Sequence, residues 1–409
     1  MKDLIKVLGA KLWLVLSLFV SGVIVARIAT PAEFGLYAAA LSLILILDGV
    51  LGAPLDTSGV RFAALYADDE SRVDRFLGAL FRLKLLVAAA AGALLATSAT
   101  VSGVPDWSWR LIAATAFSTV CLMAVRSVMN YLQVNLRFST YSSLDLLLAS
   151  LRLLFVCVAA YIGVLTAGPY VALYGLCALL VVLVGLLRIK QNYLLAPWPD
   201  REDGRAMLRH AGLVSLVIML GTLTGRSDIL ILEARAGAES AGLYAVAFHM
   251  ASVVTLLAGY ISVVSQPRIV AWVRDRRAAG FVRLNMMLGT AASIIIVGVS
   301  YFLPQLVTWV FGDAYADARP LLNILLFGAC LDLLIMPILL SFALQLLPRQ
   351  ALIVEAVIAA GFFAAVFTID GLEPLTMAWI VTAVRGVKLL SYLGMFIFRQ
   401  DAVQSSSSL

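Results

Sequence analysis

Residues 26–38 read ARIATPAEFGLYA, and residues 234–245 read ARAGAESAGLYA. Their shared GLYA core begins at Gly35 and again at Gly242, 207 residues later, in a chain of 409 residues. Each copy lies between the first and the second apolar segment of its half of the chain. This placement predicts an internal repeat, in which the two halves have the same topology.

The composition places both halves in a membrane. Hydrophobic residues make up 62% of the chain and charged residues only 13%, which is far from the composition of a soluble domain. Because a membrane-spanning helix needs roughly 20 apolar residues, the sequence has room for twelve spans and little else. No hydrophilic stretch is long enough for a soluble catalytic domain. We therefore expect a membrane protein that is not an enzyme.

The apolar segments predict an all-α integral membrane protein with about twelve transmembrane helices. Since each half has an even number of helices, both halves start on the same side and form a parallel repeat. We expect two six-helix lobes around a central cavity, residues 1–198 and 199–400, and a short cytoplasmic tail at residues 401–409. The predicted helices span residues 8–28, 34–53, 77–98, 110–134, 140–164, 168–187, 210–233, 240–265, 284–311, 319–346, 351–370 and 374–398.

Basic residues orient the chain. With both termini in the cytoplasm, eighteen Lys and Arg residues fall in cytoplasmic loops and termini, whereas the opposite side holds only Arg27, Arg110, Arg235 and Arg319. Cytoplasmic loops carry the excess of positive charge in membrane proteins, so we predict that both termini are cytoplasmic. The net charge of +6 is then a topology signal, and its spread over several loops argues against nucleic-acid binding.

Four stretches resemble the polysaccharide transporter and oligosaccharide flippase family. Residues 27–38 are similar to the first extracellular turn of that family, and residues 228–245, from DILIL to GLYA, are similar to its passage from helix 7 to helix 8. The stretch FGDAY at 311–315, followed by LLNIL at 321–325, resembles its helix 9 to 10 loop. A weaker match is NLRF at 135–138. The order and spacing of these stretches, more than any single one, carry the resemblance.

The family belongs to the multidrug, oligosaccharidyl-lipid and polysaccharide exporter superfamily. The resemblance implies a flippase of the bacterial inner membrane that translocates undecaprenyl-diphosphate-linked oligosaccharide by alternating access, for the biosynthesis of O-antigen, capsule or exopolysaccharide. It also implies that the partners are the lipid-linked oligosaccharide, membrane lipids and other polysaccharide-assembly proteins.

Ionisable residues inside the predicted spans are costly and mark pathways or pairs. Of ten candidates for such positions, five are basic and five are acidic, so internal pairing can neutralise all ten. We expect Lys388 to pair with Glu355 of the preceding helix, whereas Arg385 has no obvious partner in that hairpin. The ten residues are Asp48, Arg126, Asp145, Arg152, Arg226, Asp228, Asp332, Glu355, Arg385 and Lys388.

A diphosphate suits the planar guanidinium group, which can contact two phosphate oxygens at once. We therefore predict that the substrate diphosphate is bound by Arg126, Arg152, Arg226 and Arg385, lining the cavity from both lobes. The carboxylates Asp145, Asp228 and Asp332 are candidates for binding a coupling proton or sodium ion, or for salt bridges. We favour salt bridges.

Other functions fit the sequence less well. A drug exporter or a peptidoglycan-precursor flippase of the same superfamily shares the fold, although the latter usually has two further helices. A membrane polymerase or ligase usually needs a large external loop with catalytic residues, and each external loop here is short. The four cysteines lie in apolar segments without metal-binding spacing, and no phosphate-binding loop of ATPases occurs. We expect neither a cofactor nor a metal.

Overall fold

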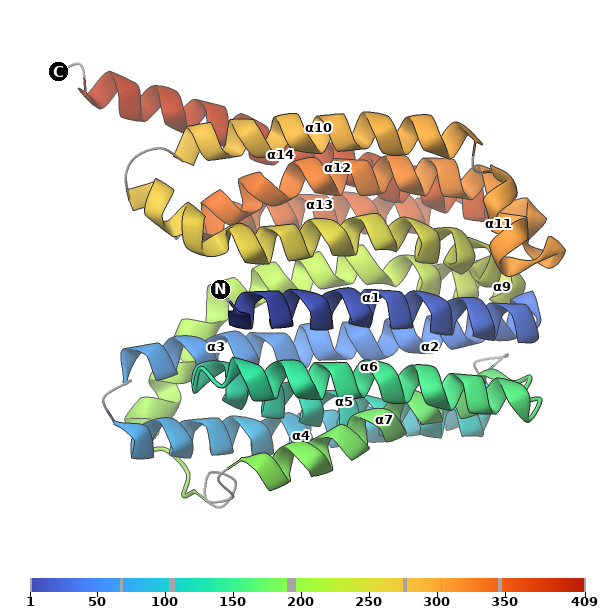
Figure 1. Ribbon diagram of the computed structural model, residues 1–409, viewed down its shortest axis with the longest axis horizontal. Helices are drawn as coiled ribbons and strands as arrows, with labels where there is room; N and C mark the ends of the chain where they lie inside the picture. Colours follow the sequence, from blue (N-terminus) through green and yellow to red (C-terminus); the bar gives the residue numbers. More distant parts are fainter. Residues whose placement is uncertain are drawn as a thin grey trace. The chain divides into compact units, whose positions relative to one another are not determined.

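The computed structural model describes residues 2–66, 69–102, 107–189, 196–274, 278–302, 304–344 and 348–407, and every regular element in these ranges is a helix (Figure 1). Ten helical segments there are long and apolar enough to cross a membrane, and Leu12–Ile28 is a shorter apolar helix. One of the ten, Ser215–Leu256, has 42 residues and contains a kink, so its two arms correspond to two of the predicted spans. The protein is a multi-pass membrane protein.

The chain divides into two compact units, residues 1–242 and 243–409. The predicted lobe boundary between residues 198 and 199 stays a prediction. Unit 1 contains α1 (Lys2–Ile28), α2 (Pro31–Leu47), η1 (Asp48–Gly52), α3 (Ala53–Leu65), α4 (Glu70–Ser102), α5 (Trp109–Val134), α6 (Phe138–Tyr161), α7 (Ala167–Arg188) and the first part of α9 (Arg201–Arg274). Within it, α5 packs against α2, α3, α4 and α7, and α1 packs against α6.

Small residues bring α5 and α7 together. The hydroxyl of Ser118 on α5 donates to the carbonyl oxygen of Val171 on α7 over 2.6 Å. One turn further along α7, a Cβ at Gly175 would lie only 2.5 Å from the Ser118 oxygen. Glycine therefore permits the close helix approach that small residues typically provide in membranes. This contact places α5 at the centre of unit 1, where it is the most buried of the candidate spans.

The first copy of the repeated motif begins α2. Thr30 caps the helix, because its hydroxyl accepts a hydrogen bond from the Glu33 backbone N–H, and Pro31 occupies the first helical turn. The Glu33 carboxylate accepts a 2.7 Å hydrogen bond from the backbone N–H of Ala167 at the start of α7. A carboxylate at a helix N-terminus is favourable because it compensates the free N–H groups and the helix dipole.

The two motif glycines lie next to each other within unit 1. A Cβ at Gly35 would collide with the backbone of Ala238 and Gly242, and a Cβ at Gly242 would collide with the backbone of Pro31. Any larger residue would push these backbones apart. Close approach of the two segments is therefore the physical reason for glycine in both copies of GLYA.

Helix α2 continues beyond its predicted end at residue 53. The segment η1 is a π-helical turn, and α3 extends the helix to Leu65 through what was expected to be a loop. The polar residues of α3 find partners inside the protein: Ser58 donates to the Pro54 carbonyl oxygen, and Asp56 pairs with Lys84. Because these groups are satisfied without water, the helix does not end where the apolar run ends.

Two predicted helices, 210–233 and 240–265, are the arms of α9. They meet at Gly237, whose backbone has φ 85° and ψ 166°. This conformation is accessible essentially only to glycine, so a sharp kink replaces the predicted loop between these helices.

Unit 2 contains the remainder of α9, α10 (Ala278–Phe302), α11 (Pro304–Phe311), η2 (Asp313–Ala318), α12 (Arg319–Leu344), α13 (Pro348–Thr368) and α14 (Pro374–Ser407). Helix α12 packs against α10 and α14, around the buried residues Val282, Ile338 and Tyr392. The predicted helix 284–311 is two helices, because Pro304 lacks a backbone donor and begins α11. The predicted tail is helical as far as Ser407, since no glycine or proline ends α14.

Candidate functional site

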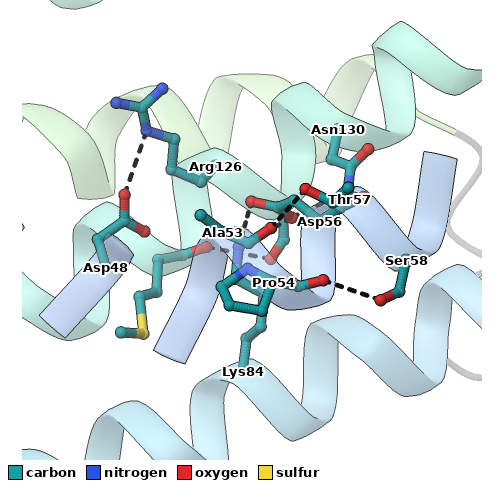
Figure 2. A network of polar contacts seen from close by, with 11 residues as sticks. Asp48, Ala53, Pro54, Asp56, Thr57, Ser58, Lys84, Arg126 and Asn130 are labelled. Carbon is teal, nitrogen blue, oxygen red and sulfur yellow. Dashed lines mark hydrogen bonds and ion pairs between the residues drawn. The ribbon is translucent and has the colours of Figure 1, made fainter. Parts of the chain in front are cut away.

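A network of charged and polar groups lies inside unit 1 (Figure 2). The Lys84 ammonium of α4, only 1% exposed, contacts both carboxylate oxygens of Asp56 at 3.0 and 2.9 Å. The side-chain amide of Asn130 on α5 donates to the same carboxylate at 2.9 Å and to the Asp56 carbonyl oxygen at 3.1 Å. The network therefore fastens α3 to α4 and α5 by a paired charge and two further hydrogen bonds.

Asp48, at the start of η1, faces Arg126 of α5 in the same view (Figure 2). The Nε atom of Arg126 lies 3.7 Å from one oxygen of the Asp48 carboxylate. The other oxygen, Oδ1, is buried and has no hydrogen-bond partner among the described residues. A Cβ at Gly52 would lie 2.8 Å from that oxygen. The glycine in the π-helical turn thus leaves room for the carboxylate.

The side chain of Arg126 is much more exposed than those of its neighbours on α5. Residues 118–132 of α5 are buried or nearly so, except for Arg126, whose side chain is 53% exposed. The surrounding groups come from several elements: Asp48 of η1, and Tyr174 and Tyr141, which lie close enough to interact with its charge. An exposed cation with carboxylate and phenol neighbours indicates solvent-accessible polar surroundings, because a lipid-facing arginine at this depth would be costly.

Arg152 contacts the same tyrosine, Tyr174. Its guanidinium carbon stands 3.9 Å from the centre of the Tyr174 ring, in a cation–π arrangement. The residue is only 8% exposed, and its Nε atom has no hydrogen-bond partner in the described part of the chain. Tyr174 of α7 therefore contacts one predicted diphosphate ligand, Arg152, and lies near a second, Arg126.

The other predicted site residues of unit 1 lie on α6 and α9. Asp145 is buried on α6, and Asp228 is buried on α9, where its carboxylate accepts a hydrogen bond from the Ile229 backbone N–H at 2.9 Å. Arg226 is partly buried, two residues before Asp228. The roles predicted for these three residues stay predictions.

Unit 2 pairs the remaining two predicted residues. Arg385 of α14 lies 3.5 Å from the Asp332 carboxylate of α12, and the Thr255 hydroxyl donates to the same carboxylate oxygen at 3.3 Å. A Cβ at Gly328 would lie 3.1 Å from an Arg385 terminal nitrogen, so this glycine lets the guanidinium cross α12. Arg385 thus finds its partner in α12 and not in its own hairpin.

The predicted pair of Lys388 and Glu355 is confirmed, with 2.6 Å between the ammonium and the carboxylate. Glu355 is buried, and the Tyr392 hydroxyl donates to the same carboxylate oxygen at 3.0 Å. Two groups of α14 therefore neutralise and bind one carboxylate of α13.

Asp56 and Lys84 were missed at the sequence level. Lys84 lies well inside the predicted helix 77–98, so a lysine at that depth was the available signal. Asp56 fell in a predicted loop, and no sequence pattern placed it beside α4. In the described part of the chain, no group of three or more His, Cys, Asp or Glu residues is arranged to hold a metal ion.

A family model described as polysaccharide biosynthesis protein matches residues 7–272. No curated protein matches the sequence. Among solved structures, an inward-facing multidrug resistance MATE family transporter of the MOP superfamily has 15% identity, coverage of 99% of both chains and a TM-score of 0.70. The lipid II flippase MurJ, in an inward closed conformation, has 12% identity, coverage of 96% of this chain and 86% of its own, and a TM-score of 0.73.

A MOP superfamily transporter from Pyrococcus furiosus has 12% identity, coverage of 99% of this chain and 96% of its own, and a TM-score of 0.63. At such low identities these likenesses describe the fold. They confirm the predicted all-α fold with many membrane-spanning helices.

Proposed function

Since this chain belongs to the polysaccharide biosynthesis protein family, we propose that it is a flippase for undecaprenyl-diphosphate-linked oligosaccharide. It moves the lipid-linked sugar across the bacterial inner membrane by alternating access and so supplies the assembly of a surface polysaccharide. Both termini lie in the cytoplasm. The likeness in fold to a lipid II flippase supports this proposal, because that protein is named for the movement of a lipid-linked precursor.

The observation that carries the proposal is the exposed guanidinium of Arg126 in an otherwise buried stretch of α5. A lipid-linked oligosaccharide has two chemically different ends, and its diphosphate carries concentrated negative charge. An arginine that solvent can reach inside a membrane protein is suited to that group, since its fork of N–H donors matches phosphate oxygens. Arg126 is therefore the leading ligand for the diphosphate.

The other proposed ligands of the diphosphate are Arg152, Arg226 and Arg385. Arg152 and Arg385 differ in how far their charges are already paired within the protein. Arg152 is held on Tyr174, and its Nε atom has no hydrogen-bond partner among the described residues, so this donor is available to an anion. Arg385 already has a partner in Asp332. The Arg385 side chain is only 16% exposed, compared with 53% for Arg126, so a diphosphate reaches it less easily, which makes Arg385 a weaker ligand than Arg126.

In the proposed mechanism, the main role of the carboxylates is to form salt bridges with the arginine residues. Asp332 is engaged by Arg385 and Thr255, which favours a salt bridge over ion coupling at this residue. Asp145 and Asp228 remain proposed partners for cations or for a coupling proton or sodium ion.

A drug exporter is the second candidate, because the fold also resembles that of a multidrug resistance MATE transporter. A cationic drug would be repelled by the guanidinium that this chain exposes at Arg126. The sign of that charge favours the lipid diphosphate.

Deleting the gene in its own bacterial host tests the proposal. We expect loss of the surface polysaccharide and accumulation of lipid-linked oligosaccharide that stays on the cytoplasmic side, since synthesis continues while translocation stops. Arg126→Gln should reproduce this phenotype at normal protein levels, whereas Arg110→Gln, an exposed arginine near the start of the same helix, should restore export. Normal surface polysaccharide in the deletion strain would contradict the proposal.

A further inference from the structure

The contact between Arg126 and Asp48 is loose compared with its neighbour. Lys84 and Asp56 make two contacts of 3.0 and 2.9 Å, whereas Arg126 reaches Asp48 through Nε alone, at 3.7 Å. Neither terminal nitrogen of Arg126 donates a hydrogen bond within the described part of the chain. A guanidinium has five N–H donors, so most of the hydrogen-bonding capacity of Arg126 is left for another anion.

Two cations, Arg126 and Lys84, lie close enough to Asp48 to interact with its charge. Asp48 begins the π-helical turn η1, and π-helical turns are frequent at functional sites. Its unpartnered oxygen lies over Gly52, and the position of a Cβ at Gly52 would be 3.3 Å from the Lys84 side-chain carbon Cε. Lys84 is also close enough to interact with the Asp48 charge. Lys84, which reaches Asp56 in Figure 2, is therefore the second cation available to the Asp48 carboxylate if that carboxylate leaves Arg126.

The charges of this cluster balance. Arg126 and Lys84 supply two positive charges, and Asp48 and Asp56 supply two negative ones. A diphosphate that binds Arg126 adds negative charge, which the carboxylate of Asp48 would oppose if it stayed. Movement of Asp48 toward Lys84 separates the two anions and keeps each beside a cation.

We propose that Asp48 is an internal competitor for the anion site at Arg126: it occupies the guanidinium while substrate is absent and yields to the substrate diphosphate by turning toward Lys84. The inference rests on the proposed function and adds a residue to it. Asp48 then sets how tightly the site binds, because each substrate has to displace one carboxylate. A site that releases its cargo on the far side of a membrane benefits from such a competitor.

Binding of inorganic pyrophosphate to the purified full-length protein, followed by calorimetry in one detergent, tests the inference. Asp48→Asn keeps the shape and removes the competing charge, and we expect it to bind pyrophosphate about fivefold more tightly than the unchanged protein. Asp48→Glu keeps the charge, and its longer side chain can close the 3.7 Å gap, so it should bind pyrophosphate more weakly. Asp370→Asn, an exposed change of the same net charge, should leave binding unchanged.

Arg126→Gln separates the inference from the proposed function. If Arg126→Gln abolishes binding but neither Asp48 variant changes it in the expected direction, Asp48 is not a competitor, and the anion site at Arg126 stands. Tightening in Asp48→Asn that persists when Arg126→Gln is added would also overturn the inference. If Arg126→Gln alone leaves pyrophosphate binding unchanged, there is no anion site at Arg126, and the inference is refuted. The flippase function would still be tested by the phenotype of the deletion strain. Should Asp48→Asn fail to fold, weaker binding by Asp48→Glu supports the inference, and equal or tighter binding refutes it.

Discussion

Replacing Lys84 by methionine tests the buried charge pair of unit 1. The substitution removes the ammonium and keeps most of the side-chain volume, which leaves the Asp56 carboxylate with the single hydrogen bond that Asn130 donates to it. Removing one partner of a buried ion pair typically costs about 3–5 kcal/mol, because the other charge is left without compensation. Asp56 is 25% exposed, so we expect the lower end, about 3 kcal/mol.

The opposite substitution, Asp56→Asn, should cost more. It leaves the Lys84 ammonium, which is only 1% exposed, beside an amide. The double variant Lys84→Met, Asp56→Asn removes both charges and should recover most of the lost stability, since replacing a complete buried pair by neutral groups is often tolerated. The coupling energy between the two sites should then be about 3 kcal/mol.

Thermal unfolding of the four purified proteins in one detergent measures these differences. For a unit of this size, about 3 kcal/mol corresponds to a fall in the midpoint temperature of about 10 °C. The reasoning is refuted if both single variants unfold within about 2 °C of the unchanged protein, or if their effects simply add in the double variant.

Four further substitutions test other parts of the fold by the same unfolding measurement. Gly237→Ala should lower the free energy of unfolding by about 1–3 kcal/mol, because a backbone φ of 85° is strained for any residue that has a side chain. Its control Gly225→Ala, with open space around it, should be neutral or stabilising. Glu33→Gln should cost about 1 kcal/mol by weakening the cap of α7. Lys388→Met should cost about 3 kcal/mol and Tyr392→Phe about 1 kcal/mol, since only the first leaves Glu355 without a cation; equal losses would contradict the pairing.

The membrane fold could be predicted from the sequence because the length of each apolar segment and the turn residues between segments determine where each helix begins and ends. The start of α2 at Thr30 and Pro31 follows from capping chemistry in four consecutive residues. The repeat of GLYA predicted two similar halves, and the contact of Gly35 with the backbone at Gly242 supplies the physical reason for the shared glycine. The predicted family is confirmed by the match to the polysaccharide biosynthesis model.

The polar network was harder to predict because its members come from three helices. Asp56 lies beyond the apolar run of its helix, and only the packing of α3 against α4 and α5 brings it to Lys84 and Asn130. The kink at Gly237 was predicted as a loop, because the sequence AGAES has the composition of a turn. In the structure, the chain changes direction at the single residue Gly237, and both sides of it are helical. An ion pair within one helical hairpin, such as Lys388 with Glu355, could be predicted from the positions of the two residues along the sequence.

Transport by the purified protein in vesicles tests the central claim most directly. Lipid-linked oligosaccharide would be generated in the inner leaflet, and its arrival outside would be followed with a glycosidase that cannot cross the membrane. We predict that the protein accelerates arrival of the diphosphate-linked sugar well above the rate in protein-free vesicles, and that Arg126→Gln lowers this rate at least tenfold while Arg110→Gln does not. A rate equal to that of protein-free vesicles, or one that Arg126→Gln leaves unchanged, would contradict the account.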